Sequence, residues 1–253
     1  FAVLLVLGWW AWSRAVVPTA RGLTLGVLPR VHPLSQPRFV RLLAVFVVNG
    51  TASAVPATLV LFFVQDRLQA PASVEPAFLA TYFLCAALSL PLWVRLVPRL
   101  GLARSWLAGM ALAIVVFVWA ATLGAGDTVA FLIVCALSGI AVGTDLTLPS
   151  AMLAGLIGRL GERGQREGAY FGWWSFAAKM NLALAAGLAL PLLAWFGYTP
   201  GARDPQALHT LTVAYCLLPC VLKLLAAGLL HTLLIRPERH SATAPSSPLK
   251  VHP

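Results

Sequence analysis

Charge is what this sequence has least of. Only 10% of its 253 residues are charged, whereas 60% are hydrophobic. About a quarter of the residues of an ordinary soluble domain are charged. This shortage excludes a water-soluble globular protein, because apolar runs of this length would be left on its outer surface. The sequence therefore predicts an all-α protein that crosses a membrane several times.

Groups of metal-ligating or catalytic residues are also absent. Cys216 and Cys220 share a helix face, but no His or acidic residue accompanies them at ligand spacing. We interpret all four cysteines as packing residues and expect no metal and no cofactor. A membrane-embedded enzyme would need His, Asp, Glu or Cys converging at one depth. The apolar runs offer no such set, so we do not expect an enzyme.

A nucleic-acid-binding pattern is missing as well, despite the net charge of +10. The basic residues are scattered singly through polar segments and form no stripe with interleaved aromatics, so no nucleic-acid partner is expected. The start of the chain lacks the basic segment and small-residue cleavage site of a signal peptide. It begins at Phe1 inside an apolar run, and we therefore expect that upstream sequence is missing.

Long apolar runs dominate what remains. A membrane-spanning helix needs about 20 predominantly apolar residues, and by this criterion we predict seven transmembrane helices. Their expected ranges are 1–17, 39–64, 76–97, 105–123, 128–149 (continuing to 156), 169–196 and 209–235. The segment 18–38 contains four prolines and is expected to be a loop. The tail 236–253 is polar and is expected to be disordered.

Basic residues alternate between the connectors in a way that sets the orientation. Lys and Arg gather in 18–38, 95–104, 158–168 and the tail, and the positive-inside rule places these segments in the cytoplasm. We therefore expect a multi-pass protein of the cell (inner) membrane with a cytoplasmic C-terminus. Seven helices in this orientation suggest that 1–17 is the last helix of an N-terminal half, with 18–38 as the central loop. The range 39–235 would then form a complete six-helix C-terminal half.

Two ionisable residues lie where the bilayer would be apolar. Charges inside a membrane mark a transport path, a proton relay or a buried ion pair. Lys179 falls near the middle of its span and is expected either to contact substrate or coupling ion, or only to lock two helices together. Asp145 lies in the preceding span, and antiparallel neighbours would bring it within reach of Lys179. We therefore predict Asp145 and Lys179 as partners.

Further polar residues inside the spans are weaker candidates for contact with substrate. Asn49 and Asn181 can hydrogen-bond a polar substrate but can equally bond a neighbouring helix. Lys223, halfway along the last span, could line a cavity or reach the interface. Small residues of the span 169–196 are expected to permit close helix approach: Gly172, Ala177, Ala178, Ala183, Ala185, Ala186 and Gly187.

Three segments resemble one family of transporters. They are GTDLTLPSAMLAG (143–155), GQREGAYFGWWSFAAKMNLALA (164–185) and LPLWVRLVPRLGLARSWLAG (90–109). Together they are similar to the C-terminal half of the glycoside–pentoside–hexuronide cation symporters, the melibiose-carrier-like branch of the major facilitator superfamily. In the second segment, Lys179 stands at the family's lysine position.

The resemblance implies cation-coupled symport of a sugar, glycoside or similar polar solute by alternating access, with Na⁺ or H⁺ as the coupling ion. Expected partners are the solute, the coupling cation, the lipid bilayer and the missing N-terminal half, which would carry most coupling carboxylates. The basic turn and the helix entry imply a cytoplasmic gate formed by Arg95, Arg99, Arg104, Arg166 and Glu167. Two alternatives stay open: a lysophospholipid-type transporter of the same branch, and a non-transporting membrane scaffold subunit.

Overall fold

A computed structural model describes residues 9–10, 13–14 and 32–236 of the chain. The chain divides into two compact units, Phe1–His32 and Pro33–Pro253, and the description below concerns the second. Most of the predicted span 1–17 and of the predicted loop 18–38, and nearly all of the tail, lie outside the described residues.

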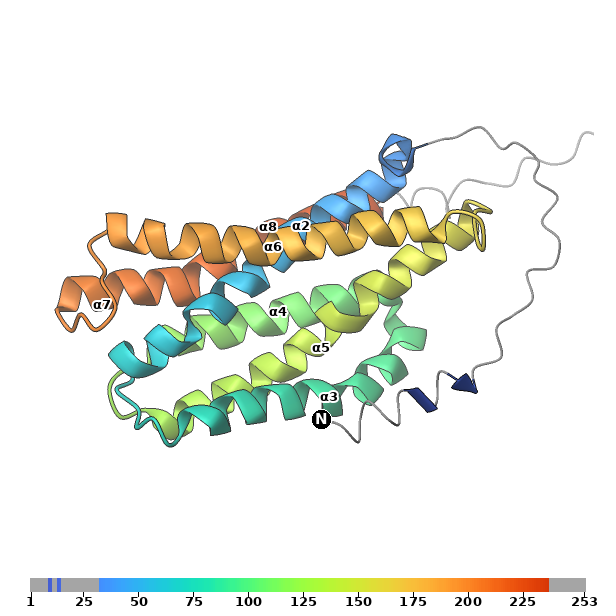
Figure 1. Ribbon diagram of the computed structural model, residues 1–253. Coiled ribbons are helices and arrows are strands. Elements are labelled where there is room, and N and C mark those ends of the chain that lie inside the picture. Colours follow the sequence, from blue (N-terminus) through green and yellow to red (C-terminus); the bar gives the residue numbers. More distant parts are fainter. Residues whose placement is uncertain (1–8, 11–12, 15–31, 237–253) are drawn as a thin grey trace, which may run out of the picture. The chain divides into compact units, whose positions relative to one another are not determined.

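Every regular element within residues 32–236 is helical (Figure 1). The predicted all-α fold is thereby confirmed. A short 3₁₀ turn, η1 (Pro33–Ser35), precedes α2 (Pro37–Phe62), and α2 continues through a π-helical turn, η2 (Phe63–Arg67). The middle helices are α3 (Glu75–Leu100), α4 (Leu102–Ala120), α5 (Thr128–Arg159) and α6 (Glu167–Trp195). The last span combines α7 (Pro205–Thr212), η3 (Val213–Leu217), α8 (Leu218–Leu230) and η4 (His231–Ile235).

The helices have the length and apolar character that a bilayer requires. Five spans of the described chain qualify by both criteria: Pro37–Arg67, Glu75–Leu100, Leu102–Ala120, Thr128–Arg159 and Pro205–Ile235. With 29 residues, α6 also has the length to cross. Large apolar side chains point outward, as Leu88 does with 69% of its surface exposed. A surface of this kind is stable against lipid tails and not against water.

Local sequence explains where several helices start and stop. Pro37 and Pro205 occupy first-turn positions, where a missing backbone N–H costs nothing. The Asp204 carboxylate accepts a hydrogen bond from the backbone N–H of Ala207 at 2.9 Å and caps α7. Between α3 and α4 the chain reverses at the single residue Gly101, whose φ of +83° is a conformation that favours glycine.

Glycine sets how closely the helices cross. The main packing partners are α3 with α5, α5 with α4, α2 with α6 and α8, and α4 with α8. On α5, a Cβ atom at Gly139 would lie 2.3 Å from the backbone oxygen of Tyr82, and one at Gly143 would lie 2.2 Å from Ser89 Oγ. On α4, a Cβ at Gly109 would lie 2.0 Å from Thr144 Oγ1. These glycines therefore hold α5 close against both neighbours.

Of the small residues of α6, Ala177 and Ala185 are buried as expected, but Gly172 and Gly187 make no close approach within the described part of the chain. A Cβ atom at either position of α6 would meet nothing within 4 Å. The close approach between α2 and α6 uses Gly50 instead, where a Cβ would lie 2.0 Å from Asn181 Nδ2. A tight helix crossing needs small residues, but the composition of a helix does not show which of its faces packs against a neighbour.

Two apolar clusters divide the bundle along its helices. One contains the second half of α2 with the beginning of α5 and includes Phe63 and Phe131. The other contains the beginning of α2 with the end of α5 and includes Phe39 and Ile157. Between these clusters α2, α5 and α8 each contribute a polar side chain, Asn49, Asp145 and Lys223, and the candidate functional site lies there.

Candidate functional site

A buried ion pair joins α5 and α8 between the two apolar clusters. Lys223 Nζ lies 3.0 Å from Asp145 Oδ2, and the two side chains are 5% and 13% exposed. A buried charge that lost its partner would be strongly destabilising, so each of these groups requires the other.

Both carboxylate oxygens of Asp145 are fully engaged. Oδ1 accepts hydrogen bonds from Asn49 Nδ2 at 2.9 Å and from the indole N–H of Trp106 at 2.8 Å. Oδ2 accepts from the Ser53 hydroxyl at 3.0 Å and from the Lys223 ammonium at 3.0 Å. Four donors from α2, α4 and α8 thus converge on one carboxylate of α5. Each carboxylate oxygen therefore has two donors within hydrogen-bond distance.

The ammonium of Lys223 is satisfied in the same way. It donates to Asn49 Oδ1 at 3.0 Å, to Ser53 Oγ at 3.1 Å and to Asp145 Oδ2 at 3.0 Å. Asn49 and Ser53 are four residues apart on α2 and therefore present their side chains on one face. That face lies against α5 and α8, so one helical turn of α2 supplies two ligands.

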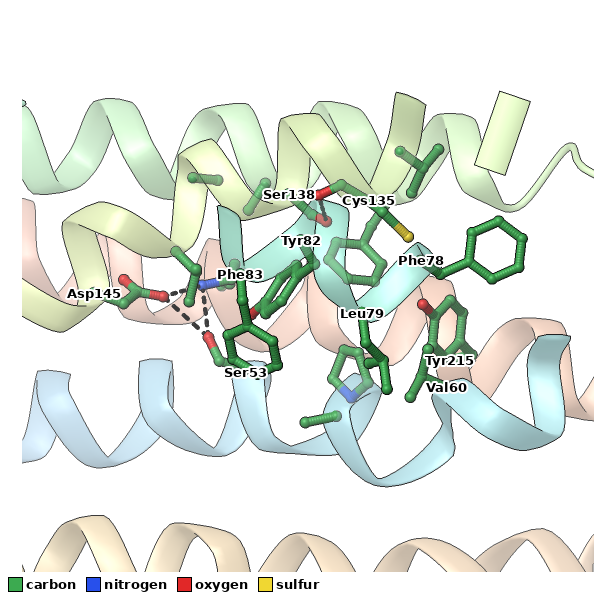
Figure 2. A pocket seen from close by; sticks show the side chains of 18 residues that line it. Ser53, Val60, Phe78, Leu79, Tyr82, Phe83, Cys135, Ser138, Asp145 and Tyr215 are labelled. Atoms are coloured by element: carbon green, nitrogen blue, oxygen red, sulfur yellow. Dashed lines mark hydrogen bonds and ion pairs between the residues drawn. The ribbon is translucent and has the colours of Figure 1, made fainter. Parts of the chain in front are cut away.

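The ion pair closes one end of an elongated cavity of about 180 Å³. Ser53 and Asp145 lie at one end of it (Figure 2), and Lys223 bonds to both of them. Most of the remaining wall is apolar and rich in aromatic rings, among them Phe78, Phe83, Phe117 and Tyr215. The cavity could hold a molecule that offers polar groups to the charged end and an apolar surface to the rest.

The cavity wall comes from five helical segments that are distant in sequence: α2, α3, α4, α5 and the last span. Phe83 and Leu79 of α3 are 65% and 40% exposed, so the cavity reaches the surface beside them. A ligand could therefore enter next to α3 without unfolding the bundle.

The predicted pairing of Asp145 with Lys179 is wrong. Asp145 pairs with Lys223, whereas Lys179 is exposed on α6. The pairing prediction assumed that consecutive antiparallel spans pack together. Instead α5 packs mainly on α3 and α4, and α6 packs mainly on α2. Of the predicted substrate residues, the structure brings Asn49, Asp145 and Lys223 together and leaves Lys179 and Asn181 outside this cluster.

Asn181 lies at the crossing of α2 and α6. Its side chain is buried, and its Oδ1 accepts a hydrogen bond from Thr51 Oγ1 at 3.3 Å. This contact joins two helices and does not line the cavity.

The predicted gate residues lie around two connectors. Arg95, Arg99 and Arg104 flank the turn at Gly101 and are exposed. Arg166 lies 3.9 Å from Glu162 in the connector before α6, and the neighbouring Glu167 begins that helix. Their role in gating stays a prediction.

Sequence reasoning missed Ser53 and Trp106. A signal for Ser53 was present, because it follows Asn49 by four residues and must share its helix face. Trp106 carried no comparable signal. A tryptophan near a helix start is expected at the membrane interface, yet this side chain is completely buried and donates to Asp145.

A second polar cluster ties together connectors at one end of the bundle. Asp66 in η2 accepts from the Tyr198 hydroxyl and from the backbone N–H of Gly201, and Arg67 Nε donates to the carbonyl of Leu123. Burial, followed by the hydrogen bond to Asp66, raises the pKa of Tyr198 above its ordinary value. The phenol donates to Asp66, and the cluster fixes this end of α2.

Comparison with known proteins places the chain in a family. No individual curated protein matches the sequence. The sequence profile described as "MFS/sugar transport protein" matches residues 25–236, which includes every described helix from α2 to the last span. Because this match covers well over half of the chain, the protein belongs to the MFS/sugar transport protein family and is an integral, multi-pass membrane transporter of the major facilitator type.

Proposed function

We propose that this protein is a secondary active transporter that moves a sugar, glycoside or similar polar solute together with H⁺ or Na⁺. It works by alternating access, and the described helices α2 to α8 act as the C-terminal half of the transport fold. The solute binds in the cavity, with its polar groups at Asp145 and Lys223. We further assign it to the glycoside–pentoside–hexuronide branch, in the inner membrane with a cytoplasmic C-terminus.

The observation that carries this proposal is the position of the buried ion pair at the end of a cavity. A pair that served only to join helices could lie anywhere in the core, whereas this one lines an open space. The same observation argues against a non-transporting scaffold, for which a charged pair away from any cavity would be expected. Family membership adds that the transported solutes are of the sugar type.

A lysophospholipid-type substrate is the second candidate, and the apolar wall favours it. Beyond the polar end, the cavity is lined mainly by residues such as Val60, Leu79 and Phe117. A free sugar offers hydroxyl groups on all sides and would leave many of them without hydrogen-bond partners against such a wall. A polar head with an apolar portion would satisfy both ends.

A pair of matched substitutions tests whether the cavity is the transport site. Ala57 of α2 and Ala80 of α3 are both exposed, but only Ala57 lines the cavity. Ala57→Trp should place an indole ring in the space that a solute would occupy and reduce uptake by about tenfold or more, which corresponds to a loss of about 1.4 kcal/mol in solute binding. Ala80→Trp should leave uptake close to that of the parent protein.

The measurement is uptake into proteoliposomes under an inward H⁺ or Na⁺ gradient. The tested solutes are a panel of labelled sugars and glycosides and, separately, a labelled lysophospholipid. Uptake of a glycoside supports the first candidate, and uptake of the lipid alone supports the second. Equal uptake by the Ala57→Trp and Ala80→Trp proteins would contradict the assignment of this cavity.

A further inference from the structure

The ammonium of Lys223 is held in the way that a protein holds a free cation. Its three acceptors are an amide oxygen, a hydroxyl oxygen and a carboxylate oxygen at 3.0–3.1 Å, provided by Asn49, Ser53 and Asp145. Hard cations in proteins take the same kinds of oxygen ligand. The Lys223 side chain is only 5% exposed, so these oxygens replace most of the water around its charge.

The three oxygen ligands are oriented independently of Lys223. The Asn49 amide donates to Asp145 Oδ1, which turns its own oxygen toward the ammonium, and the Ser53 hydroxyl donates to Asp145 Oδ2. Trp106 fixes the carboxylate from the other side. The cage is thus built by α2 and α5 with support from α4, while the cation reaches it from α8.

We propose that Asn49, Ser53 and Asp145 form a monovalent-cation site in which the Lys223 ammonium is the resident cation, attached to α8 by its own side chain. A tethered cation has a high effective concentration at its site, so Na⁺ or K⁺ from solution does not compete for it. The inference rests on the proposed function only in placing this site at the transport cavity. Alkali-ion coupling, if the carrier uses it, then takes place elsewhere.

The test is whether a free amine can replace the tethered one. Lys223→Ala removes three methylene groups and the ammonium, a fragment equal in length to n-propylammonium. The cavity lined by Asp145 and Lys223 reaches the surface beside Phe83, so a small amine can enter. The melting temperature of the purified full chain in detergent is measured with chloride salts of choline, sodium, ammonium and methyl-, ethyl-, n-propyl- and n-butylammonium at equal ionic strength.

The expected pattern is specific. The Lys223→Ala protein should melt below the parent protein in choline chloride, because its buried carboxylate has lost its counter-ion. Primary amines should raise its melting temperature saturably, with n-propylammonium recovering most of the loss and n-butylammonium less. The parent protein should melt at the same temperature in all salts. Lys179→Ala, which removes an exposed lysine of α6, should behave like the parent.

A double variant identifies the charge that binds the amine. Asp145→Asn combined with Lys223→Ala keeps the cavity but removes the carboxylate, and it should not respond to any amine. If Lys223→Ala does not fold, Lys223→Ser, which leaves nearly the same space for an amine, is taken through the same series. Melting of the single variant at the same temperature in n-propylammonium and in choline, or an equal response of the double variant, would overturn the inference.

The amine experiment and the uptake experiment test the cation site and the proposed function separately. A parent protein that transports none of the solutes tested, together with a clear amine response of Lys223→Ala, would contradict the proposed function and leave the cation site standing. Normal transport without an amine response would contradict the cation site alone.

Discussion

Two buried tryptophans donate their indole N–H groups to α5, and only one of the acceptors is charged. Trp106 donates to the Asp145 carboxylate at 2.8 Å, and Trp93 donates to the backbone carbonyl of Ile140 at the same distance. Hydrogen bonds to charged groups contribute about 1.5–3 kcal/mol and neutral ones about 0.5–1.5 kcal/mol. The two tryptophans therefore form a matched pair for measuring what the charge on Asp145 adds.

We expect Trp106→Phe to destabilise the protein more than Trp93→Phe. Phenylalanine keeps an aromatic ring in each position and removes the donor, so packing losses should be comparable. The difference in free energy of unfolding, measured in detergent by chemical denaturation, should be about 1 kcal/mol or more. A Trp93→Phe protein that is equally or more destabilised would mean that Trp106 does not stabilise a charged carboxylate.

At the residue scale, the sequence was enough to predict which residues belong to the polar cluster but not which of them pair with each other. Asp145 stood out because a charge in an apolar run is rare, and Lys223 and Asn49 for the same kind of reason. The partner of Asp145 depended on which helices touch, and chain order is a poor guide to that. Lys179 and Lys223 both lie in apolar runs of the sequence, yet Lys179 is exposed on α6 and Lys223 is buried on α8.

At the scale of elements, glycines on α5 determine how closely this helix packs against α3. Gly139→Ala would place a Cβ atom 2.3 Å from the Tyr82 backbone oxygen, which cannot rotate away, so α3 and α5 must separate. The same substitution at Gly172 meets open space. There alanine should be neutral or stabilise α6 by about 0.5–1 kcal/mol, since glycine weakens a helix interior.

We therefore expect Gly139→Ala to lower the melting temperature and Gly172→Ala to leave it unchanged or raise it. Differential scanning fluorimetry of both proteins in the same detergent makes the comparison. A Gly139→Ala protein as stable as the parent would mean that the helices do not cross this closely. The outcome also bears on the site, because Asp145 lies on α5 between this crossing and the second apolar cluster.

Helix boundaries were predictable at this scale because length and hydropathy are local properties. The predicted span 76–97 became Glu75–Leu100, and 169–196 became Glu167–Trp195. The turn at Gly101 is local as well, because glycine readily adopts the positive φ found there. What the sequence did not contain was the choice of neighbours. That choice is made by shape, as where Gly50 accommodates Asn181 and Gly109 accommodates Thr144.

At the scale of the whole molecule, the two intramembrane lysines should separate stability from transport. Lys223 is buried in the ion pair, so its loss should destabilise the bundle. Lys179 is exposed on α6, and removing an exposed side chain usually changes stability by no more than about 0.5 kcal/mol. If Lys179 faces the transport path in the complete carrier, its effect should appear in uptake alone.

We accordingly predict that Lys179→Ala leaves the melting temperature of the purified chain within error of the parent and abolishes uptake and counterflow in a carrier that transports. Lys179→Arg, which keeps the charge, is the matched control and should retain part of the activity. Both are measured in proteoliposomes with equal amounts of inserted protein. Unchanged uptake and counterflow by the Lys179→Ala carrier would remove Lys179 from the transport mechanism. Of the three charged residues predicted to contact substrate, Asp145 and Lys223 would then remain.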